Sequence, residues 1–156
     1  MLNKTTETHT MSNIKGLKRM CAALLVFTIS MAMTAQTTQP FVGRFFNRET
    51  GITLVVNAYE ESVEVPGMSF LGTTYGYLSG RGIYGLWLVW KTETNDQEAT
   101  LHFASDTGSD HQKVRVTMTD ATHLEMQTLG SVTFKKAVGR KWVKLDNKLT
   151  FEKLKD

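Results

Sequence analysis

Gly85-Leu86-Trp87-Leu88-Val89-Trp90-Lys91 is an almost wholly apolar stretch that contains two of the three tryptophans of the chain. In a strand, successive side chains point to opposite faces. One face would therefore carry Leu86, Leu88 and Trp90, and the other would carry Trp87 and Val89. A strand with one solvated face would alternate apolar with polar residues, but here both faces are apolar. We expect the first face to line a barrel interior and the Trp87/Val89 face to form a homo-oligomer contact.

Similar short segments recur on both sides of this strand and are separated by turns, most of which contain glycine, aspartate or asparagine. They cover positions 41–48, 52–58, 62–66, 73–80, 99–104, 114–118, 123–128, 131–136, 141–145 and 149–154. We expect the last four to pair as two hairpins, around Leu129-Gly130 and Asp146-Asn147. The sequence predicts an all-β fold, an antiparallel up-and-down meander β-barrel of about eight to ten strands. A Greek-key sandwich is the alternative.

The N-terminal segment has the features of a secretory signal peptide. Lys15, Lys18 and Arg19 precede an apolar run at 21–33, and Ala35 is a small residue suited to cleavage. The run is too short to span a membrane. We therefore expect a signal peptide at 1–35, a barrel domain at 36–156, and a secreted or periplasmic location. The single cysteine, Cys21, lies in the signal segment, so the barrel would have neither a disulfide nor a thiol nucleophile.

The charges of the expected barrel domain balance but are unevenly distributed. Positions 36–156 contain 14 Lys/Arg and 14 Asp/Glu, whereas positions 131–156 contain eight basic and three acidic residues. The basic residues alternate with apolar ones, which is typical of solvated edge strands, where lysine prevents unwanted pairing. We therefore expect no nucleic-acid partner.

Candidate catalytic residues are few. Ser109, Asp110 and His111 are consecutive in a polar loop, and adjacent loop residues rarely converge on one point. Asp106-Thr107-Gly108 matches a short aspartic-protease signature, but three-residue matches are common by chance. His102, His111 and His123 do not have the spacing of metal ligands. We expect no enzyme, no metal and no cofactor.

Four short motifs, taken together and in order, resemble the avidin/streptavidin family of calycin-type barrels. Gly43-Arg44-Phe45-Phe46-Asn47 with Gly51 resembles that family's first strand and turn, and Leu78-Ser79-Gly80-Arg81 resembles a later strand. The stretch 85–91 resembles the strand that ends in Trp-Lys, and Trp142 with positions 150–155 resembles the last strands. A lipocalin-like or fatty-acid-binding relative in the same superfamily is the alternative.

The resemblance implies a ligand site. Asn47 would bond a ureido oxygen, and Trp90, Phe103 and Trp142 would form aromatic walls, Trp142 from a neighbouring subunit. Phe45 would replace a buried tryptophan, and Thr53 is the nearest match to a first-turn serine. However, Ala99, Leu101 and Leu149 stand where the family has polar partners. Each lost buried partner costs roughly 1–3 kcal/mol, so we expect biotin to bind weakly or not at all.

Two functional hypotheses follow. In the first, a secreted, non-enzymatic β-barrel binds a small, largely apolar ligand in its mouth. Its expected ligand-binding residues are Phe45, Asn47, Thr53, Trp90, Leu101, Phe103 and Trp142. In the second, the barrel is filled by its own side chains, as composition alone favours, and serves as an interaction or structural module with no small-molecule ligand.

Overall fold

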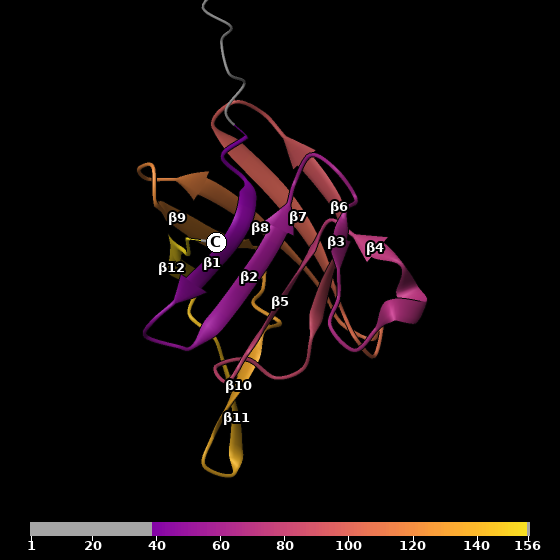
Figure 1. Cartoon of the computed structure of the whole chain (residues 1–156). Helices are drawn as coiled ribbons and strands as arrows, with labels where there is room; N and C mark the ends of the chain where they lie inside the picture. Colours follow the sequence, from indigo (N-terminus) through magenta and orange to yellow (C-terminus); the bar gives the residue numbers. More distant parts are fainter. Residues whose placement is uncertain (1–38, 156) are drawn as a thin grey trace, which may run out of the picture. The chain divides into compact units, whose positions relative to one another are not determined.

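The computed structural model describes residues 39–155, which form a closed, eight-stranded antiparallel barrel (Figure 1). Its strands are β1 (Val42–Asn47), β2 (Ile52–Asn57), β5 (Gly76–Gly80), β6 (Trp87–Thr94), β7 (Glu98–Ser105), β8 (His111–Met118), β9 (His123–Leu129) and β12 (Lys148–Lys153). Each strand pairs with the next barrel strand along the chain, and β12 pairs with β1 to close the sheet. The predicted all-β meander barrel is therefore confirmed. The predicted signal peptide, with Cys21 and Ala35, lies outside the described residues.

Two short hairpins interrupt the meander. β3 (Val63–Glu64) and β4 (Thr73–Thr74) pair with each other between β2 and β5 and flank the 3-10 turn η2 (Ser69–Leu71). β10 (Lys135–Val138) and β11 (Lys141–Lys144) pair between β9 and β12 and project from one end of the barrel (Figure 1). Between residues 39 and 155, no helix is long and apolar enough to cross a membrane.

The pairing of the last strands differs from the sequence-based prediction. Segment 131–136 does not pair with 123–128, nor 141–145 with 149–154; instead, β10 pairs with β11, and β12 pairs with β9. Gly139 adopts a positive φ of 62°, which allows the tight turn between β10 and β11. The buried side chains of β12 and β9 match in register, with Leu149 opposite Met126. The local sequence pattern does not indicate the pairing of β12 with β9, because the β10–β11 hairpin separates these two strands along the chain.

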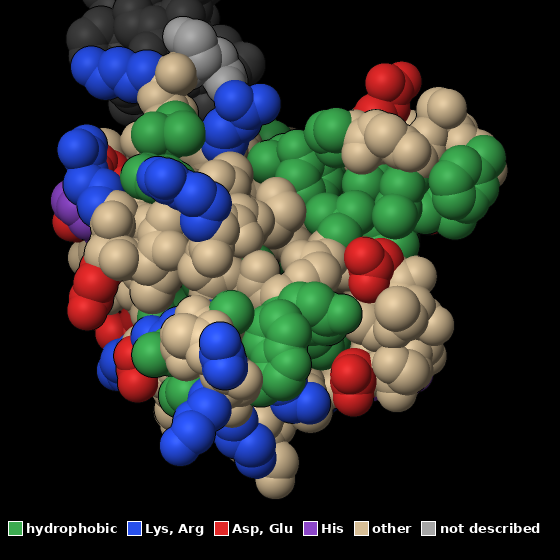
Figure 2. Space-filling model, turned by 90° about the horizontal axis from the view of Figure 1, so that it is seen from below, with side chains coloured by type: hydrophobic (Ala, Val, Ile, Leu, Met, Phe, Trp, Pro, Cys, Tyr) green, Lys and Arg blue, Asp and Glu red, His purple; other side chains and the backbone are tan. Residues whose placement is uncertain are grey.

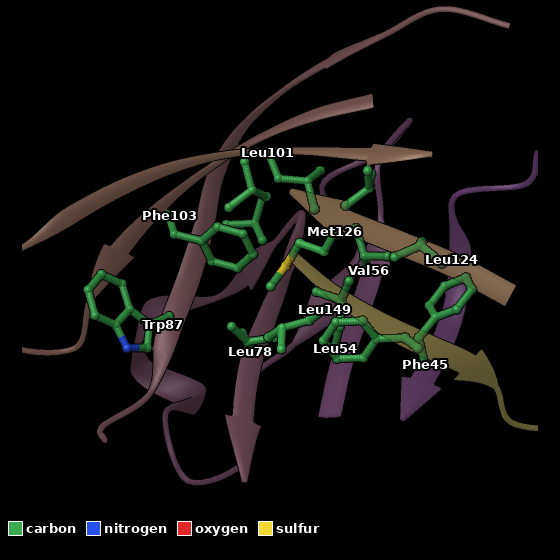
Figure 3. Packing of buried hydrophobic residues seen from close by; sticks show 14 of the residues in the cluster. Phe45, Leu54, Val56, Leu78, Trp87, Leu101, Phe103, Leu124, Met126 and Leu149 are labelled. Atoms are coloured by element: carbon green, nitrogen blue, oxygen red, sulfur yellow. The ribbon is translucent and has the colours of Figure 1, made fainter. Parts of the chain in front are cut away.

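Alternation places a largely apolar row of most barrel strands in the interior. β7 buries Ala99, Leu101 and Phe103, which alternate along the strand. The close-up in Figure 3 shows these rows meeting inside the barrel. The described core comprises Phe41, Phe45, Ile52, Leu54, Val56, Ala58, Leu78, Ile83, Trp87, Val89, Ala99, Leu101, Phe103, Val114, Val116, Leu124, Met126, Phe134, Leu145, Leu149 and Phe151.

The predicted orientation of β6 is wrong. Trp87 and Val89 are buried in the core, whereas Trp90 is 55% exposed. Both faces of the strand are apolar, so alternation does not determine which face points inward. Pairing with β5 determines which face points inward, because Trp87 lies opposite the buried Leu78. The Trp87/Val89 face is therefore part of the core and is not available for the predicted homo-oligomer contact.

A β-bulge lies at Trp90. The register with β7 shifts between Val89, which pairs with Phe103, and Lys91, which pairs with His102. Alternation from the buried Val89 already places Trp90 outside the barrel, and the bulge leaves the next residue, Lys91, exposed as well.

Candidate functional site

Three of the seven predicted ligand-binding residues belong to the core. Phe45, Leu101 and Phe103 are completely buried. They pack with aliphatic residues from other strands, including Leu54 and Met126 (Figure 3). These three side chains are therefore part of the packed core, and their role in ligand binding remains a prediction.

Three other predicted residues lie outside the barrel interior. Trp90 lies in the bulge of β6 and contacts the ring of His102, with ring centroids 5.6 Å apart. Trp142 lies on β11 and is 58% exposed. Thr53 is on the face of β2 opposite the buried Ile52 and Leu54. The roles of these residues in ligand binding remain predictions.

The seventh residue, Asn47, is buried at the end of β1 and is bonded to the scaffold. Its Nδ2 donates to the Thr150 carbonyl oxygen at 2.9 Å. Its Oδ1 accepts hydrogen bonds from the Thr50 N–H at 2.7 Å and the Thr50 hydroxyl at 2.8 Å. Asn47 thus links the β1–β2 turn to β12, and its role in binding a ureido oxygen remains a prediction.

Phe134 closes the end of the barrel from which the β10–β11 hairpin projects. It is 1% exposed and packs edge to face with Trp87, at a centroid distance of 4.7 Å, and with Phe103, at 5.7 Å. Its carbonyl oxygen accepts a hydrogen bond from the Leu145 N–H at 3.0 Å. The segments that enter and leave the hairpin are therefore fixed together over the core.

A buried glutamine holds the segment that precedes Phe134. The Oε1 of Gln112 accepts hydrogen bonds from the Thr133 N–H at 2.7 Å and the Thr133 hydroxyl at 2.8 Å. Its Nε2 donates to the carbonyl oxygens of Lys113 at 3.1 Å and Leu129 at 3.4 Å. Buried polar groups need such partners, and here they position the loop that carries Phe134.

Above Phe134, two exposed aromatic residues contact each other. The ring centroids of Tyr84 and Trp142 are 4.3 Å apart, and the rings are tilted by 57°. The Tyr84 carbonyl oxygen accepts a hydrogen bond from Nε1 of Trp87 at 3.1 Å, and its N–H donates to the Lys135 carbonyl oxygen at 2.7 Å. A notch of about 130 Å³ beside them is lined by Tyr84, Trp87, Asp110, Thr133, Lys135 and Trp142. Pockets for drug-sized ligands usually measure about 300–1,000 Å³, so this notch is too small for one.

The β10–β11 hairpin, residues 135–144, is strongly basic, and we call it the basic hairpin. Its five cations are Lys135, Lys136, Arg140, Lys141 and Lys144, and it contains no acidic residue. None of the five forms an ion pair with another residue in the range 39–155. Lys135 lies directly opposite Lys144 in the register. Figure 2 shows basic side chains beside an apolar patch on this side of the molecule.

Of the other candidate residues, Ser109 lies in the β7–β8 loop, and His123 is the first residue of β9, next to the turn at Asp120. The Ser109 hydroxyl bonds to that of Thr107 at 2.9 Å within the β7–β8 loop. His123 Nδ1 lies 2.8 Å from Asp120 Oδ2. Hydrogen bonds from the backbone N–H and hydroxyl of Thr122, and from His123, lower the pKa of Asp120 to about 2. Among residues 39–155, no group of three or more His, Cys, Asp or Glu side chains is placed to hold a metal ion.

The sequence analysis missed three residues that build this end of the barrel: Tyr84, Gln112 and Phe134. Phe134 alternates with Val132 in a segment that the sequence assigns to a strand, and nothing in that pattern indicates contact with Trp87 or Phe103. A usable signal existed for the hairpin, since Gly139-Arg140 separates two lysine-rich segments of β-forming residues.

Comparisons with protein-family models, with characterised proteins and with solved structures found no match for this chain. The closed eight-stranded barrel is compatible with a calycin-like fold. No finding supports membership of the avidin/streptavidin family.

Proposed function

We propose that this chain is a non-enzymatic interaction module, in which a filled barrel serves as a rigid scaffold and presents the basic hairpin to a partner. One observation carries the proposal: Phe134 seals the barrel end over a core that already contains Phe45, Leu101 and Phe103. This is the second of the two functions considered from the sequence.

Binding a small molecule inside the barrel would require these side chains to move. Truncation of a buried phenylalanine typically costs about 3–5 kcal/mol, and displacing Phe103 or Phe134 carries a penalty of that order. Most binding energy of an apolar ligand would be lost to this rearrangement. The closed interior therefore favours a working surface on the outside.

The basic hairpin is a suitable working surface because it contributes little to the core. Every residue of β11 is exposed, and so are Lys135, Ala137 and Val138 of β10. A two-stranded hairpin is marginally stable by itself in water. Exposed Trp and Tyr residues are enriched where proteins bind partners. Tyr84 and Trp142 form such a pair at the base of this hairpin.

The proposal includes a secreted or periplasmic location. The basic residues Lys15, Lys18 and Arg19 before the apolar run at 21–33 support it. Signal-peptide cleavage can be tested by N-terminal sequencing of the exported protein, with a cut near Ala35 as the expected result.

Ligand titration tests the closed interior. Isothermal titration of the protein with biotin, and with the neutral apolar probe N-phenyl-1-naphthylamine, should give no saturable binding. Phe134→Ala is the matched variant that removes the seal, and Phe70→Ala removes an exposed ring of the same size. Probe binding gained by Phe134→Ala alone is the expected result. Nanomolar binding of biotin by the unmodified protein would overturn the proposal and restore the small-ligand hypothesis.

A further inference from the structure

We infer that the basic hairpin, together with Tyr84, docks on the surface of an anionic phospholipid bilayer. This inference rests on the proposed function, because it names the partner of the surface that the filled barrel presents. It is carried by the charge, the apolar content and the projecting shape of residues 135–144.

The hairpin carries positive charge without internal compensation. The side chains of Lys135 and Lys144 face each other across the two strands. Like charges at directly opposite positions destabilise a β-ladder. Asp110 lines the notch at the base of the hairpin but forms no ion pair with it. Lipid phosphates would neutralise this repulsion and attract Arg140 and Lys141 at the tip.

The apolar residues are interleaved with the cations. By the strand alternation, one face of the hairpin carries Lys135, Ala137, Trp142 and Lys144, and the other carries Lys136, Val138, Lys141 and Val143. Neither face is wholly polar or wholly apolar. The headgroup region of a bilayer suits both kinds of side chain, because tryptophan favours that depth and lysine extends its charge toward the phosphates.

Within residues 39–155, the other elements leave the hairpin accessible. It extends beyond the ends of the barrel strands in Figure 1, with the Gly139-Arg140 turn at its tip. An apolar tip would favour deep insertion, whereas a tip with Arg140 and Lys141 favours shallow docking among headgroups.

A single-stranded nucleic acid fits the surface less well. Such partners need successive aromatic platforms on which bases stack. The basic hairpin has one aromatic residue, Trp142, and Tyr84 packs against its ring. The exposed Val138 and Val143 would also gain no burial from a phosphate backbone.

Vesicle flotation tests the inference. The protein should float with phosphatidylcholine vesicles that contain phosphatidylglycerol, and not with vesicles of phosphatidylcholine alone. Each cation at an anionic surface contributes about 1 kcal/mol, or roughly fivefold in affinity, so Arg140→Gln with Lys141→Gln should weaken binding roughly 25-fold. The control pair Lys91→Gln with Lys113→Gln removes the same charge from the barrel wall and should change binding less than about twofold.

Two tryptophan substitutions test whether apolar contacts contribute to membrane binding. Trp142→Ala should weaken flotation, whereas Trp90→Ala, which removes an equally exposed indole, should not. Equal binding to both vesicle types, equal losses in the two cation pairs, or no flotation at all would overturn the inference. Binding of a single-stranded oligonucleotide without flotation would also overturn it. Because the biotin and probe titrations report on the barrel interior separately, failure of membrane docking is distinguishable from failure of the proposed function.

Discussion

The indole of Trp87 packs edge to face against the ring of Phe134, with centroids 4.7 Å apart and an interplanar angle of 87°. Trp87 begins β6, and Phe134 immediately precedes β10. The contact therefore joins a barrel strand to the inserted hairpin. The same indole donates its Nε1 hydrogen to the Tyr84 carbonyl oxygen, which links the core to the exposed aromatic pair.

Replacement of Phe134 should destabilise the fold. Phe134→Ala removes a ring that is 1% exposed and leaves a cavity, so we expect the free energy of unfolding to fall by about 3–5 kcal/mol. Urea denaturation followed by circular dichroism measures this. Phe70→Ala, at a ring that is 81% exposed, should change it by no more than about 0.5 kcal/mol. Equal effects of the two substitutions would show that Phe134 does not seal the core.

Replacing each of the two tryptophans of β6 should lower the free energy of unfolding by very different amounts. Trp87→Ala removes a buried indole and its hydrogen bond, and we expect a loss of about 3–5 kcal/mol in the free energy of unfolding. Trp90→Ala should cost less than about 1 kcal/mol, because the side chain projects from a bulge into solvent. Thermal melts of the two variants compare them directly. A larger loss for Trp90→Ala would support the face assignment drawn from sequence.

Gln112 should contribute to stability through its hydrogen bonds. Gln112→Leu has a similar volume but leaves the Thr133 N–H and the Leu129 carbonyl oxygen without this partner. A buried group left unsatisfied costs about 1–3 kcal/mol, and denaturant titration should show a loss of that size. The matched control is Gln127→Leu, on the outer face of β9, which should be nearly neutral. A neutral Gln112→Leu would mean that the loop before Phe134 is fixed by packing alone.

The carboxyl group of Asp120 should make the free energy of unfolding depend on pH under acidic conditions. Its pKa is lowered from 3.8 to about 2 in the folded chain, chiefly by the Thr122 N–H and hydroxyl, with His123 adding to the effect. Its contribution is complete above the unfolded-state value and is lost as the pH falls through about 2. The loss should lie between about pH 4 and pH 2.

Chemical unfolding across that range, with Asp120→Asn as the matched variant, measures the contribution. Asparagine retains an acceptor oxygen but does not titrate, so the difference between the unmodified protein and the variant should shrink as the pH falls from 4 to 2. A difference that stays constant across this range would contradict the assignment.

The sequence predicted the barrel because alternation is a local property. On β7 and β8, one row of residues is mostly apolar and the other mostly polar, and this contrast assigns Leu101, Phe103, Val114 and Val116 to the interior, whereas it does not predict the burial of Gln112. On β6 the contrast is absent, so the prediction was wrong there. The pairing of Trp87 with Leu78 and the bulge at Trp90 arise only when three strands come together.

The candidate site was less predictable than the fold. The sequence indicated Trp142 and the basic residues near it, but the prediction was that Trp142 forms a wall of a ligand site. Its actual neighbour, Tyr84, lies far away along the chain and gives no motif. Gln112 and Thr133 are also distant in sequence, and their hydrogen bonds follow from the way β8 and the hairpin segment meet.

The sequence by itself determined most of the strands of this protein, the meander barrel class and the polarity of most strand faces, because burial imposes a two-residue period on each strand. It also determined the excess of positive charge at positions 131–156. Only the tertiary structure decided which face of β6 points inward, where Phe134 lies, and that β10 and β11 leave the barrel as a projecting hairpin. These features depend on the register of strands distant in the chain and on the volume left at the barrel end, which no local pattern encodes.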